Sequence, residues 1–178
     1  MKYRIFILTI INFILVLSCE SDDTNLDLKK IQGFYKIDKI YSDQEVDLNG
    51  DAVRSTNLKR EINDYFNNLF YDLEIRPNYT NKTDTELITL SYPQPNLSFD
   101  YPSQPDGFIE YARQGISFHY KLVDNTFIFD ANDEFIKINK LELLQPGNVI
   151  AHFSKIYYDF STQNWTEIKI IAIYKRQD

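Results

Sequence analysis

The second half of this chain is a succession of segments in which apolar and polar residues alternate, and this period constrains the fold more than any other feature. Between Gly115 and Val123 every second residue is apolar, which is the period of a β-strand with one buried face. Short turns separate it from further expected strands at Thr126–Asp130, Glu134–Leu144, Val149–Asp159 and Trp165–Lys175. Strands joined in this way form an antiparallel meander, which closes into an up-and-down β-barrel or folds into a sandwich.

The first half of the domain adds further strands and one helix. We expect strands at Gly33–Tyr41, Tyr71–Arg76 and Thr85–Tyr92. The segment Leu58–Phe66 instead carries its apolar residues at helical spacing, and it follows Ser55–Asn57, whose side chains can cap a helix. The sequence therefore predicts an all-β protein with one short helix near Leu58–Phe66, which lies across a barrel end.

A proline-rich stretch interrupts this succession of strands. Four prolines fall between Pro93 and Gly107, and a proline cannot donate a ladder hydrogen bond. We expect a loop at Pro93–Gly107. A loop of this length is either a functional lid or a disordered segment, and both interpretations stay open.

The composition agrees with one β-domain and excludes one class of partner. Phe and Tyr occur 13 times each, and aromatic residues favour a pleated, half-buried surface. Residues 31–178 have the length of a single domain with a substantial core, and we expect it to be a monomer. The formal charge is −7, so the surface repels phosphate backbones and nucleic acid is not an expected partner.

The N-terminal segment has the layout of a secretory signal peptide. Lys2 and Arg4 precede an apolar run that is too short to span a bilayer, and the run ends before the only cysteine, Cys19. The sequence Val16-Leu17-Ser18-Cys19 resembles a bacterial lipobox. The resemblance implies that residues 1–18 are removed, that Cys19 is acylated and attaches the protein to a membrane, and that residues 19–30 are a flexible tether. The alternative is an ordinary secretory signal with an incidental cysteine.

Acidic residues follow the cysteine directly. The sequence Glu20-Ser21-Asp22-Asp23 resembles the export signal of surface lipoproteins in the Bacteroidota. This resemblance implies an outer-membrane lipoprotein that is exposed at the cell surface. The alternative is that Glu20, Ser21, Asp22 and Asp23 only keep the tether solvated.

Three further motifs resemble the lipocalin-like lipoproteins of the Bacteroidota. They are the opening Gly33-Phe34-Tyr35, with tyrosine where lipocalins have tryptophan, the loop Asp47–Asp51 followed by Ser55–Leu58, and the closing hairpins. The resemblance implies a barrel of about eight strands with a cavity for one small apolar or amphipathic ligand. The alternative function is a non-enzymatic module of the cell envelope that interacts with a protein or glycan and has no small ligand.

One loop is a candidate calcium site. Asp47, Asn49 and Asp51 occupy alternate positions, which is the spacing by which a calcium loop brings oxygen atoms to one cation. However, Ala52 and Leu58 stand where such a loop carries its turn glycine and its bidentate carboxylate. The alternative is that the Asp and Asn side chains build the turn by bonding to their own backbone. Calcium is the only cofactor that the sequence suggests.

No motif indicates an enzyme, and we predict no catalytic residue. The two histidines, His119 and His152, lie in separate expected strands without metal-ligand spacing, and we expect the first to be solvated and the second half-buried. Glycine-rich phosphate loops and nucleophile elbows are absent from the sequence. Aromatic residues could line a ligand pocket or fill the core, and both interpretations apply to Tyr35, Tyr41, Tyr92, Tyr101, Tyr111 and Trp165.

Overall fold

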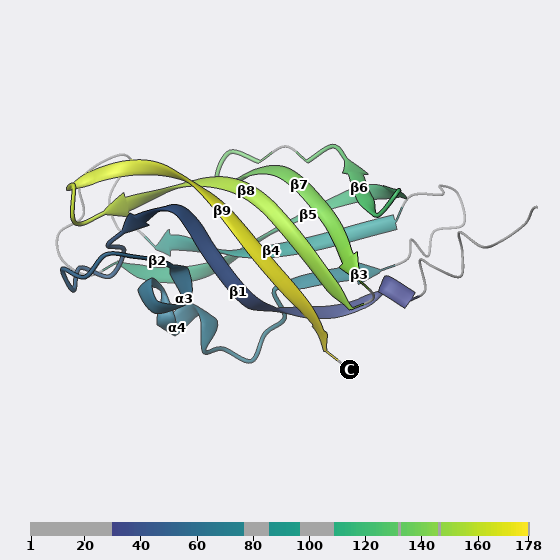
Figure 1. The fold of residues 1–178 in the computed structure, drawn as a ribbon, viewed down its shortest axis with the longest axis horizontal. Helices are drawn as coiled ribbons and strands as arrows, with labels where there is room; N and C mark the ends of the chain where they lie inside the picture. The colour runs from purple at the N-terminus through teal and green to yellow at the C-terminus, as the bar shows by residue number, and fades with distance from the viewer. Residues whose placement is uncertain (1–29, 77–85, 97–108, 132, 146, 178) are drawn as a thin grey trace, which may run out of the picture. The chain divides into compact units, whose positions relative to one another are not determined.

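Eight antiparallel strands form a closed barrel (Figure 1), which confirms the predicted fold class. Consecutive strands pair along the chain, and the last strand pairs with the first. The barrel strands are β1 Gly33–Val46, β3 Leu73–Arg76, β4 Glu86–Asn96, β5 Glu110–Val123, β6 Thr126–Phe129, β7 Lys137–Gln145, β8 Asn148–Asp159 and β9 Asn164–Gln177. A three-residue strand, β2 Ser55–Asn57, adds to the edge of β1 outside this ring.

This computed structural model describes residues 30–76, 86–96 and 109–177, except 132 and 146. Several predictions fall outside these residues: the signal peptide, the lipid attachment at Cys19, the acidic segment Glu20–Asp23, Tyr101 and most of the Pro93–Gly107 loop. In the described part of the chain, no helix has the length and apolar character needed to cross a lipid bilayer.

Alternation along each strand sends one set of side chains to the barrel interior. In β9, Ile168, Ile170, Ala172 and Tyr174 are buried while the residues between them are exposed or half-buried. In β5, the predicted faces are correct: Phe118 and Tyr120 are buried, and the intervening polar side chains are exposed. The period of two therefore builds one continuous apolar interior.

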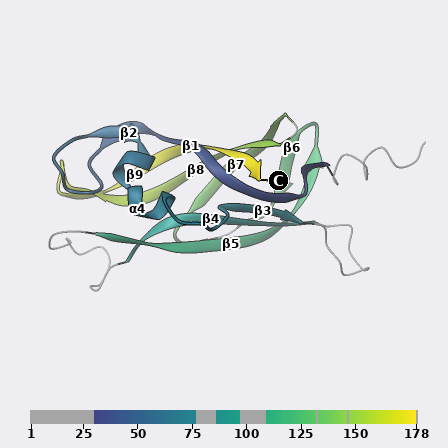
Figure 2. The same ribbon diagram turned by 90° about the horizontal axis from the view of Figure 1, so that it is seen from below.

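Two short helices replace the single predicted helix. They are α3 Leu58–Glu61 and α4 Asn63–Phe66. Ile62 separates them because its backbone leaves the helical region, with φ −125° and ψ 48°. The predicted cap is present, since Asn57 accepts a hydrogen bond from the Lys59 N–H at 3.1 Å. Helix α3 contacts β1 and β2 and helix α4 contacts β5, so this segment covers one end of the barrel, beside the β4–β5 pair (Figure 2).

The predicted loop at Pro93–Gly107 begins too early, because β4 continues through Pro93 and Pro95 to Asn96. Strand β3 pairs with β4 only as far as Leu90, and beyond that point β4 has β5 as its strand partner. The Ser91 N–H donates to Asp72 O on the β3 side at 2.7 Å, so residues 93 and 95 face the same edge. The two prolines therefore lack their N–H groups on an edge of β4 where no neighbouring strand needs a hydrogen-bond donor.

Tyrosine fills much of the interior. Six of the largest buried side chains are Tyr35, Tyr92, Tyr120, Tyr157, Tyr158 and Tyr174. Most of their hydroxyl groups have partners, and the Tyr157 hydroxyl donates to Pro93 O at 2.9 Å. The hydroxyl of Tyr174 is fully buried and has no hydrogen-bond partner among the described residues. These side chains therefore occupy much of the barrel interior.

These two tyrosines give a test of the core. We expect Tyr174→Phe to leave the free energy of unfolding unchanged or to raise it by up to about 1 kcal/mol, because the variant no longer buries an unpaired hydroxyl. The matched variant Tyr157→Phe should lower it by about 1 to 2 kcal/mol, because Pro93 O loses its donor. Urea unfolding of both variants measures the difference. Equal losses in the two variants would contradict this description of the interior.

Candidate functional site

Two pockets lie at the barrel end where β4 and β8 finish and where β5 and β9 begin. The larger has a volume of about 590 Å³ and lies between the end of β4, the segment before β7, and β8 and β9. The smaller has a volume of about 430 Å³ and lies between the Asn49–Asp51 loop, the two helices and the start of β5. We call them the Lys155 pocket and the Glu61 pocket. Both volumes fall in the range of small-molecule sites.

The Lys155 pocket contains a buried ammonium group. Strand β8 places Lys155 on its inward face between Phe153 and Tyr157, and the residue is only 3% exposed. Its Nζ donates to Gln94 Oε1, and to Phe135 O at 3.0 Å. The rings of Tyr92 and Tyr157 lie 4.8 and 5.4 Å from Nζ. The lysine is thus held by neutral oxygen atoms and aromatic faces.

Burial lowers the pKa of Lys155 to about 8, against the smaller opposing effect of Asp133. Asp133 forms no ion pair with the lysine. Its Oδ1 instead accepts hydrogen bonds from the N–H groups of Phe135 and Ile136, at 2.8 and 3.1 Å, and from the Tyr92 hydroxyl. Asp133 therefore fixes the turn that presents Phe135 O to Lys155. Across the described residues, no carboxylate forms a salt bridge with this ammonium.

The rest of the Lys155 pocket is lined by apolar residues, by carboxylates and by the exposed Lys137. Pro95, Phe135, Ile156 and Trp165 supply apolar surface, and Glu134 and Glu167 are exposed carboxylates. An ammonium group has three N–H donors, and the contacts with Gln94 and Phe135 use two of them. One N–H donor of Lys155 is therefore left without an oxygen acceptor among the described residues.

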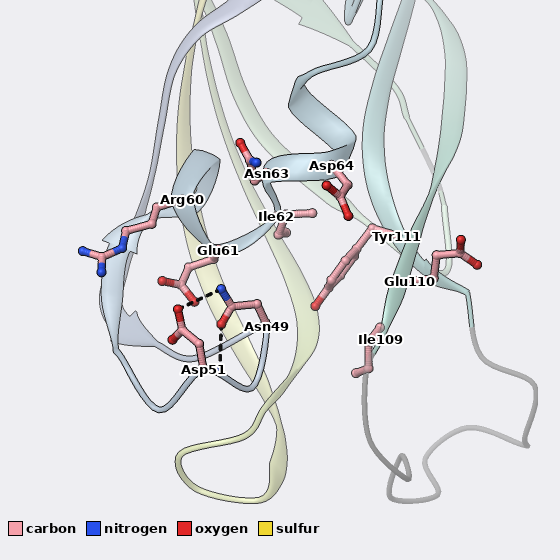
Figure 3. A pocket seen from close by; sticks show the side chains of 10 residues that line it. All are labelled: Asn49, Asp51, Arg60, Glu61, Ile62, Asn63, Asp64, Ile109, Glu110 and Tyr111. Atoms are coloured by element: carbon pink, nitrogen blue, oxygen red, sulfur yellow. Dashed lines mark hydrogen bonds between the residues drawn. The ribbon is translucent and has the colours of Figure 1, made fainter.

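The Glu61 pocket is built around a buried carboxylate (Figure 3). Glu61 is only 2% exposed, and its Oε2 accepts a hydrogen bond from the Leu48 N–H at 3.0 Å. Its Oε1 is buried and has no hydrogen-bond partner in the described structure. Burial raises the pKa of Glu61, the Leu48 hydrogen bond opposes this shift, and Asp51 and Asp47 raise the pKa further.

The predicted calcium residues lie together in one loop, and their oxygen atoms bond to the loop backbone. Asp47 accepts from the N–H groups of Gly50 and Ala52 at 2.7 and 3.0 Å. Asn49 Oδ1 accepts from the Asp51 N–H at 3.1 Å, and Asp51 Oδ1 from the Val53 N–H at 2.8 Å. These bonds are those of the alternative interpretation, in which the side chains build the turn. Among the described residues, no three His, Cys, Asp or Glu side chains are placed to hold a metal ion, and calcium binding here stays a prediction.

The other candidate residues are dispersed. His119 is exposed and His152 is half-buried, as predicted, and His152 Nε2 lies 3.9 Å from Glu142 Oε2. Of the aromatic candidates, Trp165 lines the Lys155 pocket and Tyr111 lines the Glu61 pocket. Tyr35 and Tyr92 belong to the core, and Tyr41 is exposed. The core interpretation is therefore confirmed for Tyr35 and Tyr92, and ligand binding by Tyr111 and Trp165 stays a prediction.

Sequence reasoning missed the two residues at the centres of the pockets. Lys155 had a signal, because it stands at an inward position of the predicted strand Val149–Asp159, two residues from Phe153 and from Tyr157. A lysine among inward aromatic residues indicates a site. Glu61 gave no such signal, because a glutamate in a short amphipathic helix is ordinarily solvent-exposed.

Comparisons with protein-family models, with curated protein sequences and with solved structures find no match to this chain. The structure itself defines the class: an all-β protein with a closed eight-stranded antiparallel barrel and two pockets at one end.

The depressed pKa of Lys155 predicts a pH dependence of stability. Below pH 8 the lysine is charged in both the folded and the unfolded state, and folding bears the cost of its burial. Between about pH 8 and pH 10 the unfolded state binds more protons, so the free energy of unfolding rises with pH. We expect the free energy of unfolding of the wild type to rise by up to about 3 kcal/mol relative to that of Lys155→Met over this pH range.

Urea unfolding at several pH values measures this gain, and the comparison with the variant removes contributions from other groups. Lys137→Met is the control, because it removes an exposed lysine of the same pocket. Its difference from the wild type should stay constant with pH. If the difference in the free energy of unfolding between the wild type and Lys155→Met were also constant with pH, burial would not lower the pKa of Lys155.

Proposed function

We propose that this protein binds a small amphipathic molecule with one anionic group, and that the Lys155 pocket is the binding site. The observation that carries the proposal is the buried ammonium of Lys155, which has no ion-pair partner among the described residues and lies beside an apolar wall. A buried charge is costly unless it is paired, and a ligand carboxylate would supply the pair.

The two parts of the ligand would contribute differently. Covering about 200 Å² of apolar surface with an alkyl chain stabilises a complex by about 5 kcal/mol before the costs of association. The carboxylate adds selectivity, because a neutral head group would leave the ammonium unpaired. The exposed Glu134 and Glu167 at the rim disfavour polyanions, so a monocarboxylate fits better than a phosphate-rich ligand.

We further propose that the protein is a lipocalin-like lipoprotein that displays this barrel at the outer-membrane surface through acylated Cys19. The support is the set of sequence motifs described above, and the closed antiparallel barrel is compatible with them. A tethered barrel of this kind would hold amphipathic molecules close to the membrane from which they come. No enzymatic step is part of this proposal.

The only tryptophan of the chain makes the proposal testable, because Trp165 lines the pocket. We expect its fluorescence to change when decanoate is titrated into the purified protein, and to change less with 1-decanol at equal concentration. Lys155→Met should weaken decanoate binding at least tenfold and change decanol binding by less than about threefold, since the lost interaction is a charge-assisted hydrogen bond. Binding of decanoate by the wild type should also weaken above pH 8, where Lys155 loses its proton.

Lys137→Met is again the matched control, and it should change decanoate affinity by less than about threefold. Equal affinities of the wild type and Lys155→Met for decanoate would refute the role of the lysine. A wild type that binds neither compound would refute the ligand class.

A second candidate function is an envelope-interaction module without a small ligand, and one observation favours it. Leu69 and Phe70 are 91% and 63% exposed. The next residue, Tyr71, is also exposed, and its ring stacks on the exposed Phe34 ring with 4.6 Å between the ring centroids. The guanidinium of Arg113 lies 5.2 Å from the centre of the Phe70 ring. Exposed aromatic residues of this kind occur at binding surfaces. A Phe70→Ser variant that loses binding to a purified envelope glycan or protein, while Lys155→Met retains it, would favour this function.

A further inference from the structure

The Glu61 pocket has an acidic lining that the proposed function does not use. Its wall contains four carboxylates, from Asp51, Glu61, Asp64 and Glu110, and one guanidinium, from Arg60. In Figure 3 the Arg60 side chain points away from the Glu61 carboxylate. The described residues therefore leave an excess of negative charge in this pocket.

The unpaired oxygen of Glu61 indicates what the pocket lacks. Glu61 Oε1 is buried and accepts no hydrogen bond from the described residues, while Oε2 is held by the Leu48 N–H. A buried carboxylate oxygen without a donor is costly, and either a proton or a cationic donor can offset that cost. Figure 3 shows the Asp51 carboxylate next to that of Glu61, and the Asn49 amide nitrogen donates to Asp51 Oδ2 at 3.2 Å, so a cation at this place would meet two carboxylates.

The shape of the pocket favours an organic cation over a metal ion. No three metal-ligating side chains of the described chain are suitably placed, and a volume of about 430 Å³ is much larger than a bare ion needs. Ile62, Ile109 and Tyr111 also line the pocket and offer surface to a carbon skeleton. A primary ammonium carries three N–H donors, which suit neighbouring carboxylate groups.

We propose that the Glu61 pocket binds a small organic cation with a primary ammonium group. Glu61 and Asp51 would receive the ammonium, and the two isoleucines and the Tyr111 ring would cover the alkyl part. Asp64 lies on the other side of the pocket in Figure 3 and is exposed, so a second ammonium at the far end of a short chain would meet this carboxylate. The site therefore suits a short diamine better than a monoamine.

Isothermal titration calorimetry with putrescine tests this site on the purified protein. We expect saturable binding by the wild type, weaker binding of butylamine, and no binding of tetramethylammonium, which has no N–H donor. Glu61→Gln should weaken putrescine binding at least tenfold, because the amide keeps an acceptor for the Leu48 N–H but removes the charge. Asp38→Asn is the matched control, since it removes one exposed carboxylate elsewhere and should change affinity less than twofold.

The two proposals can fail separately. Lys155→Met should bind putrescine as the wild type does, and Glu61→Gln should bind decanoate as the wild type does, which also shows that this variant is folded. If Glu61→Gln does not fold, Asp51→Asn, at an exposed position, takes its place and should weaken putrescine binding at least threefold. The proposal is overturned by a wild type that binds no amine, by unchanged affinity in both variants, by equal binding of tetramethylammonium, or by calcium that binds and displaces putrescine.

Discussion

The pairing of β1 with β9 closes the sheet, and all inward side chains then share a single interior. A closed barrel of eight strands is just wide enough for side chains to fill it. Here much of that filling is tyrosine, which brings a hydroxyl group into an apolar space with every ring. A buried hydroxyl group without an acceptor costs stability, and most of these hydroxyl groups donate to the backbone or to another side chain, with Tyr174 as an exception. Pro93 O and Leu48 O accept the hydroxyl groups of Tyr157 and Tyr111.

The irregular features of the fold serve this filling. Pro93 and Pro95 have no N–H group to offer on the edge of β4 that continues beyond β3. On this same edge, the Pro93 carbonyl accepts the hydrogen bond of the Tyr157 hydroxyl. Leu58, Ile62 and Tyr65 are all buried, as their helical spacing predicts, although the backbone breaks at Ile62.

The alternation of apolar and polar residues made the strands and their inward faces predictable, because this alternation depends only on residues within one segment. In β5 the alternation alone identified Phe118 and Tyr120 as buried. The end of β4 was not predictable, because the effect of Pro93 depends on whether β3 extends far enough to need its N–H. The pockets were not predictable for a similar reason. Lys155 meets Gln94 from a strand 61 positions away, and only closure of the barrel brings them together.

Closure also explains how two buried groups of opposite charge stay apart at the same barrel end. Tyr111 bonds to Leu48 O while the Leu48 N–H bonds to Glu61, so this tyrosine belongs to the Glu61 side. The Tyr157 ring faces the Lys155 ammonium, and the two tyrosine rings contact each other with centroids 6.0 Å apart.

The two rings therefore lie between the lysine and the glutamate. If Lys155 and Glu61 met directly, they would neutralise each other and neither would attract a ligand. Among the described residues, neither group forms a salt bridge, and the packed barrel around them offsets the cost of burying both.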